Sequence, residues 1–244
     1  MRGGTSKALF FLEEYVPTDL QQRTEFLLRA CGSPDVRQID GLGGADPLTS
    51  KIAIISPANR SDVDVNYTFG QVSLTEPFVD FSANCGNISS AVGPYAIAKR
   101  LVAAVDPITT VRIFNTNTQK MVIAEVPVEQ GAVKTHGDFR ISGVPGTGAE
   151  IRLHFIDPGG ALTGKLLPTG NVVDQIILEN GKSIDVSIVD AANPTGFVRS
   201  DEIGIRGDEL PSELEARTDV LAILEEIRSR ISERLGLCGN WREA

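Results

Sequence analysis

Apolar residues recur along the chain at two different spacings. Alternating or continuous apolar runs predict strands, and apolar positions three to four residues apart predict helices. The predicted strands are residues 8–13, 51–55, 63–75, 79–82, 111–115, 121–128, 137–141, 150–155 and 183–189. The predicted helices are residues 18–31, 86–102 and 212–235, the first with Thr18 as its N-cap and the last beginning after Pro211.

Segments rich in glycine and proline separate these runs. Residues 41–46 fit neither pattern, and residues 146–148 and 157–160 have the composition of turns. Residues 163–171 are polar and marked by proline and glycine, which predicts a connector or a site loop. Because a new alternating run follows, we expect a domain boundary near Gly181, with one domain at 1–181 and the start of another at 182–244.

Composition narrows the class of protein. A chain of 244 residues with 41% hydrophobic content can bury one sizeable core or two modest ones. Its formal net charge of −9 argues against nucleic acid or an anionic membrane as a partner. No apolar run approaches the ~20 residues that span a bilayer. Residues 1–20 also lack the apolar core of a signal peptide, so a cytoplasmic location is expected.

Three cysteines and two histidines are the candidate thiols and imidazole ligands. Cys31, Cys85 and Cys238 are too few and too scattered for a disulfide framework, so all three are expected to be reduced. Cys31 and Cys238 lie where free cysteines usually act as small hydrophobes. His136 and His154 have no paired ligand and are expected to be structural. No Walker or Rossmann motif occurs either, so the sequence predicts neither a metal nor a nucleotide cofactor.

The segment 82–94 places a thiol at the start of a predicted helix. Cys85 lies in a Gly/Asn turn, and the first turn of a helix leaves backbone N–H groups unpaired at the positive end of the helix dipole. Such a turn binds carboxylates and favours the thiolate form of a nearby cysteine. Lys51 leads the apolar run at 52–55, and burial turns a lysine into a base. Taken alone, both have plainer interpretations, a buried thiol at a helix start and a strand-edge lysine that reaches water.

Five ordered motifs resemble one known family. They are Met1-Arg2-Gly3-Gly4-Thr5-Ser6-Lys7, Gly41 to Lys51, Asn84-Cys85-Gly86-Asn87, Leu166 to Asn171 and Asp190 to Thr195. In this order they resemble the PrpF family of cofactor-independent isomerases, which act on unsaturated di- and tricarboxylates such as 2-methylaconitate, 4-oxalomesaconate, aconitate and 3-methylitaconate. The resemblance implies an α+β fold of the diaminopimelate-epimerase type, with a mixed or antiparallel sheet wrapped round a central helix and a second, pseudo-symmetric domain.

The resemblance also implies which residues act. The lysine of the Ser-Lys motif and the cysteine of the Cys-Gly-Asn motif are the family's catalytic pair. Lys51 is therefore expected to be a general base or proton shuttle, and Cys85 a second acid/base or an electrostatic partner. The expected substrate-binding residues are Arg2, Thr5, Ser6, Ser50, Asn84, Gly86, Asn87, Ser89, Ser90 and Asn193. Local alternatives stay open: helix capping for Ser89 and Ser90, a glycine-rich turn for the opening motif, and a turn signal for Asn193.

The implied partner is a small polycarboxylate, and the implied chemistry is allylic proton transfer through a dienolate. Members of the family continue well past residue 244, so we expect the second domain to be incomplete here. An unfinished domain exposes apolar surface, which favours self-association and leaves a homo-oligomer open. The alternative function is a non-catalytic domain that binds carboxylates or a partner. An amino-acid epimerase of the same fold would need a second cysteine across the cleft, and Cys238 lacks the expected small neighbours.

Overall fold

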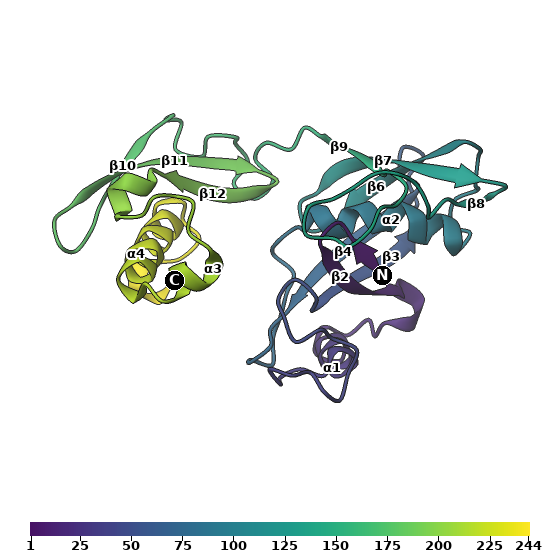
Figure 1. The fold of residues 1–244 in the computed structure, drawn as a ribbon, viewed down its shortest axis with the longest axis horizontal. Coiled ribbons are helices and arrows are strands. Elements are labelled where there is room, and N and C mark those ends of the chain that lie inside the picture. Colours follow the sequence, from purple (N-terminus) through teal and green to yellow (C-terminus); the bar gives the residue numbers. More distant parts are fainter. The chain divides into compact units, whose positions relative to one another are not determined.

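The chain forms two compact units. The computed structural model describes all residues from Met1 to Ala244 and divides them into Met1–Asp157 and Pro158–Ala244 (Figure 1). The expected boundary near Gly181 falls inside the second unit, in the turn between its first two strands. The reason is a short strand at residues 174–177, which the sequence pattern did not predict and which pairs with the predicted strand that follows.

A nine-stranded mixed sheet forms the first unit. Its strands run in the order β1-β2-β3-β4-β6-β7-β8, with β5 beside β4 and β9 beside β7. The β2–β3 and β4–β6 pairs are parallel and the other pairs are antiparallel. The strands are β1 (Arg2–Gly3), β2 (Ser6–Leu12), β3 (Lys51–Pro57), β4 (Val65–Val72), β5 (Val79–Asp80), β6 (Ile108–Asn115), β7 (Lys120–Glu129), β8 (Ala132–Val133) and β9 (Arg152–Ile156).

Helix α2 (Gly86–Ala98) lies on one face of this sheet and is buried along most of its length (Figure 1). It packs against strands from both halves of the sheet, β1, β2, β3, β6, β7 and β8. Glycine is needed at Gly93, because a Cβ there would lie 2.7 Å from Cγ2 of Val126. The helix ends at Ala98 rather than at the predicted residue 102, since Arg100 has left-handed backbone with a φ of 59°. The sheet therefore curves round a central, buried helix.

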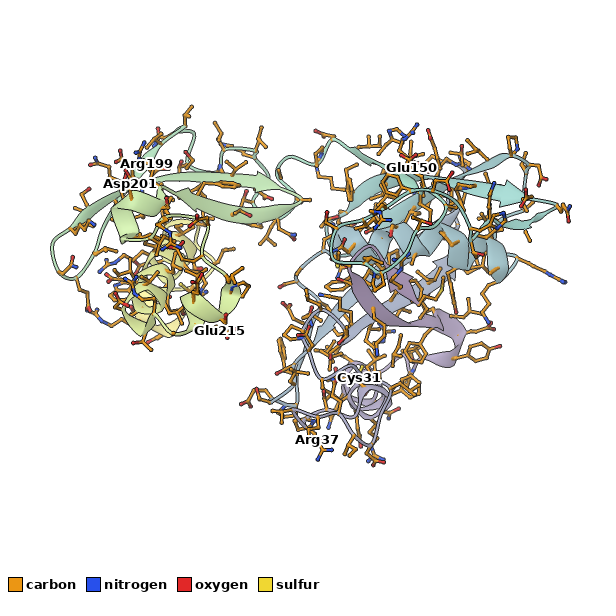
Figure 2. All side chains as sticks on the ribbon, viewed as in Figure 1. Cys31, Arg37, Glu150, Arg199, Asp201 and Glu215 are labelled. Atoms are coloured by element: carbon orange, nitrogen blue, oxygen red, sulfur yellow. The ribbon has the colours of Figure 1, made fainter.

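Helix α1 (Leu20–Cys31) covers the opposite face of β3, after the short 3-10 helix η1 (Glu13–Tyr15). Cys31, labelled in Figure 2, is fully buried there, as the sequence predicted for a small hydrophobe. Burial also raises the pKa of the Cys31 thiol to about 11. The N-cap is Asp19 and not the predicted Thr18, because the Asp19 carboxylate accepts from the backbone N–H of Gln22 at 2.9 Å.

The segment between β8 and β9 is a long loop. The predicted strand at 137–141 is wrong, because only Phe139 pairs there, in an isolated bridge with Gly148. Gly143 and Gly146 have positive φ angles of 79° and 77°, which interrupt an extended run. The next segment, β9, takes the place beside β7 instead.

The second unit is a three-stranded antiparallel sheet covered by one long helix. Its strands are β10 (Asp174–Ile177), β11 (Ser183–Ala191) and β12 (Asn193–Val198), followed by the 3-10 helix η2 (Ser200–Ile203). Alternate residues of β11 are buried, and Ile184, Val186 and Ile188 share a core with Val220 and Ile227 of the helix. This alternation is the pattern that predicted the strand.

The predicted helix at 212–235 is in fact two helices. They are α3 (Pro211–Glu215) and α4 (Thr218–Arg234), and the break falls at Arg217, whose φ and ψ are −94° and 72°. The Arg217 guanidinium pairs with the Asp219 carboxylate in the first turn of α4 at 2.8 Å. None of the helices in the chain is long and apolar enough to cross a lipid bilayer.

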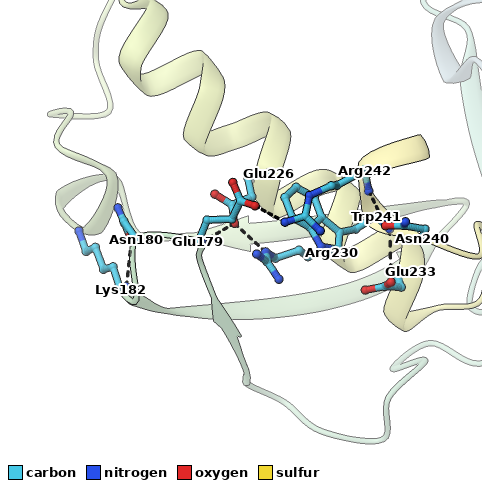
Figure 3. A network of polar contacts seen from close by, with 9 residues as sticks. All are labelled: Glu179, Asn180, Lys182, Glu226, Arg230, Glu233, Asn240, Trp241 and Arg242. Atoms are coloured by element: carbon cyan, nitrogen blue, oxygen red, sulfur yellow. Dashed lines mark hydrogen bonds and ion pairs between the residues drawn. The ribbon is translucent and has the colours of Figure 1, made fainter.

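A polar network fixes the last turn of the chain, the 3-10 helix η3 (Trp241–Glu243), to α4 (Figure 3). Two guanidinium groups lie over the Trp241 ring, with Cζ of Arg230 4.2 Å and Cζ of Arg242 4.5 Å from the ring centroid. Arg230 also pairs with Glu226 at 2.7 Å, and Arg242 pairs with Glu179 beyond the end of β10. Cation–π contacts and ion pairs thus hold a segment with little apolar burial.

Candidate active site

Lys51 is the first residue of β3 and one of the few buried charges in the chain. Its residue is 8% exposed, and its ammonium group lies 5.4 Å from the centroid of the Phe69 ring. Antiparallel pairing of β3 with β4 places Lys51 directly opposite Gln71, and Nζ donates to Gln71 Oε1 at 2.5 Å. Alternate β3 residues Ala53 and Ile55 pack in the core around α2, so Lys51 lies on the sheet face that α2 covers.

Gln71 holds the Lys51 ammonium in a fixed position. Its amide nitrogen donates to the carbonyls of Pro47 at 3.0 Å and Ser50 at 3.1 Å, which leaves Oε1 directed at Nζ. Gln71 was not predicted from the sequence, since nothing in the local pattern distinguishes it from any other polar residue on a strand. Only the register of β3 against β4 reveals its role.

Ser50, a predicted substrate-binding residue, is fully buried beneath the loop that precedes Lys51. Its hydroxyl donates to Gln38 Oε1 at 2.7 Å, and the same oxygen accepts from the backbone N–H of Ala45 at 2.9 Å. Gln38 Nε2 donates in turn to the Ser33 hydroxyl at 3.0 Å. The Ser50 hydroxyl therefore shapes the loop and does not face a cavity.

Cys85 occupies the N-cap position of α2. Its backbone is extended, with φ −126° and ψ 102°, and no side chain caps the first turn of this helix. The N–H groups of that turn are consequently left for water or for an anion, as expected from the helix geometry. The half-buried thiol packs against the same core as Ile88 and Val92 of α2.

The two serines of the first turn use their hydroxyls inside the helix. Ser89 is fully buried, and its hydroxyl donates to the carbonyl of Cys85 at 2.9 Å. The Ser90 hydroxyl donates to the carbonyl of Asn87 at 2.7 Å. The structure thus gives both residues the local, helix-stabilising partners that were the alternative to ligand binding.

The opening motif lies against the start of α2. Backbone contact is so close that a Cβ on Gly3 would lie 2.4 Å from the carbonyl oxygen of Asn87, and one on Gly4 would lie 2.1 Å from Asn87 Oδ1. The Asn87 amide nitrogen donates to Thr5 Oγ1 at 3.1 Å. Arg2 is exposed, and its guanidinium forms no hydrogen bond or ion pair within the chain. The fold thus brings Arg2, Thr5 and Asn87 together from distant parts of the sequence.

A cavity of about 450 Å³ lies beside these residues. Its lining includes the polar residues Arg2, Asn87, Ser90, Lys134 and Thr135 and the apolar residues Ala91, Pro94, Phe139, Ile141 and Ile151. Ser6 is 3% exposed, and its hydroxyl has no hydrogen-bond partner. Lys51 and Cys85 are not among the residues that line this cavity.

A second missed group of residues fixes the turn that precedes Cys85. Asn84 Oδ1 accepts from the amide nitrogen of the fully buried Asn115 at 2.7 Å. Asn115 Oδ1 accepts from the backbone N–H groups of Asn117 at 2.9 Å and Thr118 at 3.1 Å. Asn117 Nδ2 donates to the Phe81 carbonyl at 2.7 Å. The Asn-Thr-Asn-Thr run that begins at the last residue of β6 is thus a polar support for the site turn, and that run was its signal in the sequence.

The second unit contains the remaining predicted residue. Asn193 is exposed and begins β12 opposite Ala191. The neighbouring Asp190 is fully buried, and its Oδ2 accepts from the N–H groups of Leu162 at 2.9 Å and Thr163 at 2.7 Å. In the Leu166–Asn171 motif, Thr169 and Asn171 both donate to the Asp174 carboxylate. These hydrogen bonds give the motifs of this unit a clear structural purpose.

Both histidines are exposed and face carboxylates of β7. His154 Nε2 lies 3.0 Å from Glu125 Oε1, and His136 Nε2 lies 3.3 Å from Glu129 Oε2. No group of three or more metal-ligating side chains occurs in the chain. Surface pairs of this kind contribute little to stability.

Comparison with solved structures identifies the fold. The crystal structure of methylitaconate-delta-isomerase superimposes with a TM-score of 0.77 at 52% identity, covering 100% of this chain and 62% of that one. A structure described as a "probable proline racemase" from Agrobacterium radiobacter K84 matches with a TM-score of 0.52 at 17% identity, covering 87% of this chain and 49% of that one, and shows the fold alone. The protein therefore has the expected α+β fold of the diaminopimelate-epimerase type.

Sequence comparison adds the family. A family model described as PrpF protein matches residues 1–244, and the chain belongs to the PrpF family. The 3-methylitaconate isomerase of Eubacterium barkeri is 52% identical over 244 residues, which cover 100% of this chain and 64% of that protein. The chain thus spans somewhat less than two thirds of the length of this relative.

Proposed function

We propose that this chain contains the catalytic lysine and cysteine of a cofactor-independent isomerase that moves a double bond in a small unsaturated di- or tricarboxylate. Membership of the PrpF family and the relative named 3-methylitaconate isomerase support this class of reaction. The observation that carries the proposal is the environment of Lys51. Its ammonium is buried and is hydrogen-bonded to a neutral amide, and no carboxylate pairs with it.

Such an environment suits a base. No carboxylate neutralises the nitrogen, and the hydrogen bond to the Gln71 amide oxygen holds it in one position. In this role Lys51 removes a C–H proton next to a carboxylate, and the allylic dienolate takes a proton back at its other end. Cys85 serves as the second acid/base or as an electrostatic partner of the dienolate.

The first turn of α2 is suited to the charge that develops. Because no side chain caps this turn, its backbone N–H groups can bind a substrate carboxylate or the dienolate oxygens. Preorganised donors of this kind typically contribute about 3 kcal/mol each to a transition state. The unpartnered Arg2 guanidinium beside Asn87 adds a bidentate donor for a second carboxylate. We assign Thr5, Ser6 and Asn84 to the surroundings of the same substrate.

The cavity beside Arg2, which Lys51 and Cys85 do not line, would hold the end of the substrate away from the reacting carbon, and its lining favours an end with both charge and apolar surface. Its polar lining residues, Arg2 and Asn87 among them, would hold a carboxylate, and apolar ones such as Ile141 and Ile151 would contact a methyl or methylene group. Aconitate, methylaconitate, oxalomesaconate and methylitaconate share the carboxylates and differ in that small substituent. The proposed substrate class is this group of acids.

The test is proton exchange with solvent. The protein is incubated in deuterated water with each of the four acids, and deuterium uptake and double-bond migration are followed by NMR. Lys51→Met should abolish both, because no other group replaces the base. The matched control is Lys99→Met, since Lys99 lies at the far end of α2 and its Nζ is 5.8 Å from the Tyr95 ring centroid.

The outcomes separate the alternatives. Uptake on one acid that disappears with Lys51→Met and persists with Lys99→Met supports the isomerase and identifies the substrate. Uptake that persists in Lys51→Met refutes the assignment of the base. Binding of an acid by calorimetry without any exchange would instead favour the non-catalytic carboxylate-binding domain.

A further inference from the structure

A second cavity lies beside the opening motif, apart from the cavity that Asn87 lines. It has a volume of about 470 Å³ and is lined by the β1–β2 hairpin, by Thr49 and by the loop between β8 and β9. Neither Asn87 nor any other residue of α2 lines it. None of its lining residues has a carboxylate side chain, whereas Arg2 and Lys7 are both cations. This second cavity is therefore locally positive in a chain whose formal net charge is −9.

The two cations of the second cavity are cross-strand neighbours. Arg2 lies directly opposite Lys7 in the antiparallel β1–β2 pair. Side chains at such positions share one face of the hairpin, and like charges placed there destabilise the pairing. The half-buried Lys7 ammonium donates only a long hydrogen bond, of 3.5 Å, to the Leu42 carbonyl, and neither cation pairs with a carboxylate. An anion bound by both side chains would relieve this repulsion.

The Ser6 hydroxyl adds a neutral donor to the same cavity. Ser6 lines the cavity but is only 3% exposed, and its hydroxyl has no hydrogen-bond partner in the folded chain. A buried hydroxyl without a partner costs stability, and few such groups occur in native proteins. A bound anion would supply the missing acceptor.

Val144 and Pro145 give the second cavity an apolar wall. The loop turns at this point, since Gly143 has a φ of 79° and the N–H of Val144 donates to the Ile141 carbonyl at 3.1 Å. A small inorganic anion would leave this wall without a contact, whereas the methylene groups of an organic acid would pack against it.

We propose that the second cavity binds a short aliphatic dicarboxylate, with Arg2 and Lys7 as its cationic partners and the Ser6 hydroxyl as a donor. Two adjacent cations match the two carboxylates of such an acid, and charge-assisted hydrogen bonds of this kind are the strong ones in proteins. A saturated dicarboxylate has no double bond to move. Binding here is therefore a separate property of the chain and does not rest on the proposed function.

The experiment is a titration of the whole chain with succinate, followed by methyl NMR. The Val144 methyl signals report on the second cavity, and the Ile151 methyl signals report on the cavity beside Asn87. The Val144 shifts should saturate as succinate is added. Lys7→Met should weaken the affinity read from Val144 about tenfold, the effect of one charge-assisted hydrogen bond. Butyrate has the same chain length but one carboxylate, so it should also bind about tenfold more weakly.

Lys134→Met is the matched control. Lys134 lines the cavity beside Asn87 and not the second cavity, so the variant removes the same charge elsewhere. The Val144 affinity for succinate should not change. Equal weakening in the two lysine variants would reveal a general effect of net charge. Val144 signals that never saturate would show that there is no site, and inorganic phosphate bound as tightly as succinate would show that the apolar wall has no part. Each of these results overturns the proposal.

Ser6→Ala covers the case in which Lys7→Met does not fold. This variant removes a buried hydroxyl that has no partner, so its urea midpoint should equal or exceed that of the wild type. Its affinity for succinate, read from Val144, should nevertheless fall about fivefold, the effect of one hydrogen bond. An unchanged affinity in a folded Ser6→Ala variant would overturn the proposal. None of these readouts depends on isomerase activity, so this proposal and the proposed function fail independently.

Discussion

Asn117 offers a sharp test of how the site turn is held in place. Its side chain makes three short hydrogen bonds: Oδ1 accepts from the Phe69 N–H at 2.8 Å, and Nδ2 donates to the carbonyls of Phe69 at 2.8 Å and Phe81 at 2.7 Å. One amide thereby joins β4 to the segment that leads to Cys85. Replacing Asn117 with alanine removes all three bonds and leaves their backbone partners without an acceptor or donor.

The expected cost follows from those partners. A hydrogen bond contributes about 0.5–1.5 kcal/mol net, and a buried group left unpaired costs about 1–3 kcal/mol. Asn117 is only half-buried, so water can reach part of the space and satisfy some of the groups. Three bonds at roughly 1 kcal/mol each give a predicted loss of about 3 kcal/mol in the unfolding free energy of the first unit.

The assay is native-state hydrogen exchange at the Phe69 amide, followed by NMR, together with urea denaturation. Asn66→Ala is the control. Asn66 lies on β4, as Phe69 does, but its side-chain amide makes only long hydrogen bonds, to Ser56 Oγ at 3.4 Å and to the Pro57 carbonyl at 3.3 Å. That variant should lose no more than about 0.5 kcal/mol. Equal losses for the two variants would refute the view that Asn117 supports the site turn.

Two further predictions concern the turn between β1 and β2 and the pH dependence of the stability of the first unit. Gly4→Ala should lower the free energy of unfolding, measured in urea, by about 2 kcal/mol, because Gly4 has a φ of 53° and the new Cβ would displace the Asn87 side chain. Gly131→Ala is the control: Gly131 has a φ of 73° but free space around it, so this variant should lower the free energy of unfolding by only about 1 kcal/mol. The Arg112 guanidinium, which donates to Asp64 at 2.6 Å, lowers the pKa of that carboxyl, so this stabilisation is present above about pH 4 and is lost as the pH falls through the lowered folded-state pKa. Asp64→Asn should therefore flatten the fall of the urea midpoint between about pH 4 and pH 2, and an unchanged slope would contradict this linkage.

The elements with a strong local pattern could be predicted from the sequence. β3, β6, β7, β11 and the start of α2 were expected close to where they lie, because alternation or helical spacing follows directly from burial on one or two faces. The predictions that were wrong depend on less local causes. β10 and β12 exist because they pair with β11, and the break at Arg217 divides a sequence whose apolar spacing continues through it.

The candidate site divides in the same way. Residues within a motif, such as Cys85 and Asn87, could be named from the resemblance, and the fold does bring Asn87 to Thr5. Gln71 could not be found, since its role depends on pairing with a strand twenty residues away. The sequence also could not show that the Ser50 hydroxyl donates to Gln38 in the preceding loop and does not face a ligand.

The groups that hold Lys51 and the turn before Cys85 in place share one property: they are uncharged. The hydrogen-bond partner of the Lys51 ammonium is a neutral amide, and the Cys85 side chain packs against an apolar core. The fixed geometry must then come from uncharged groups, and asparagine and glutamine amides can supply it because each side chain both donates and accepts. Gln71 and Asn115 each do so here, one beneath the ammonium and one beneath the turn before the thiol. Amides at strand ends thus position the Lys51 ammonium and the turn before Cys85 without adding charge.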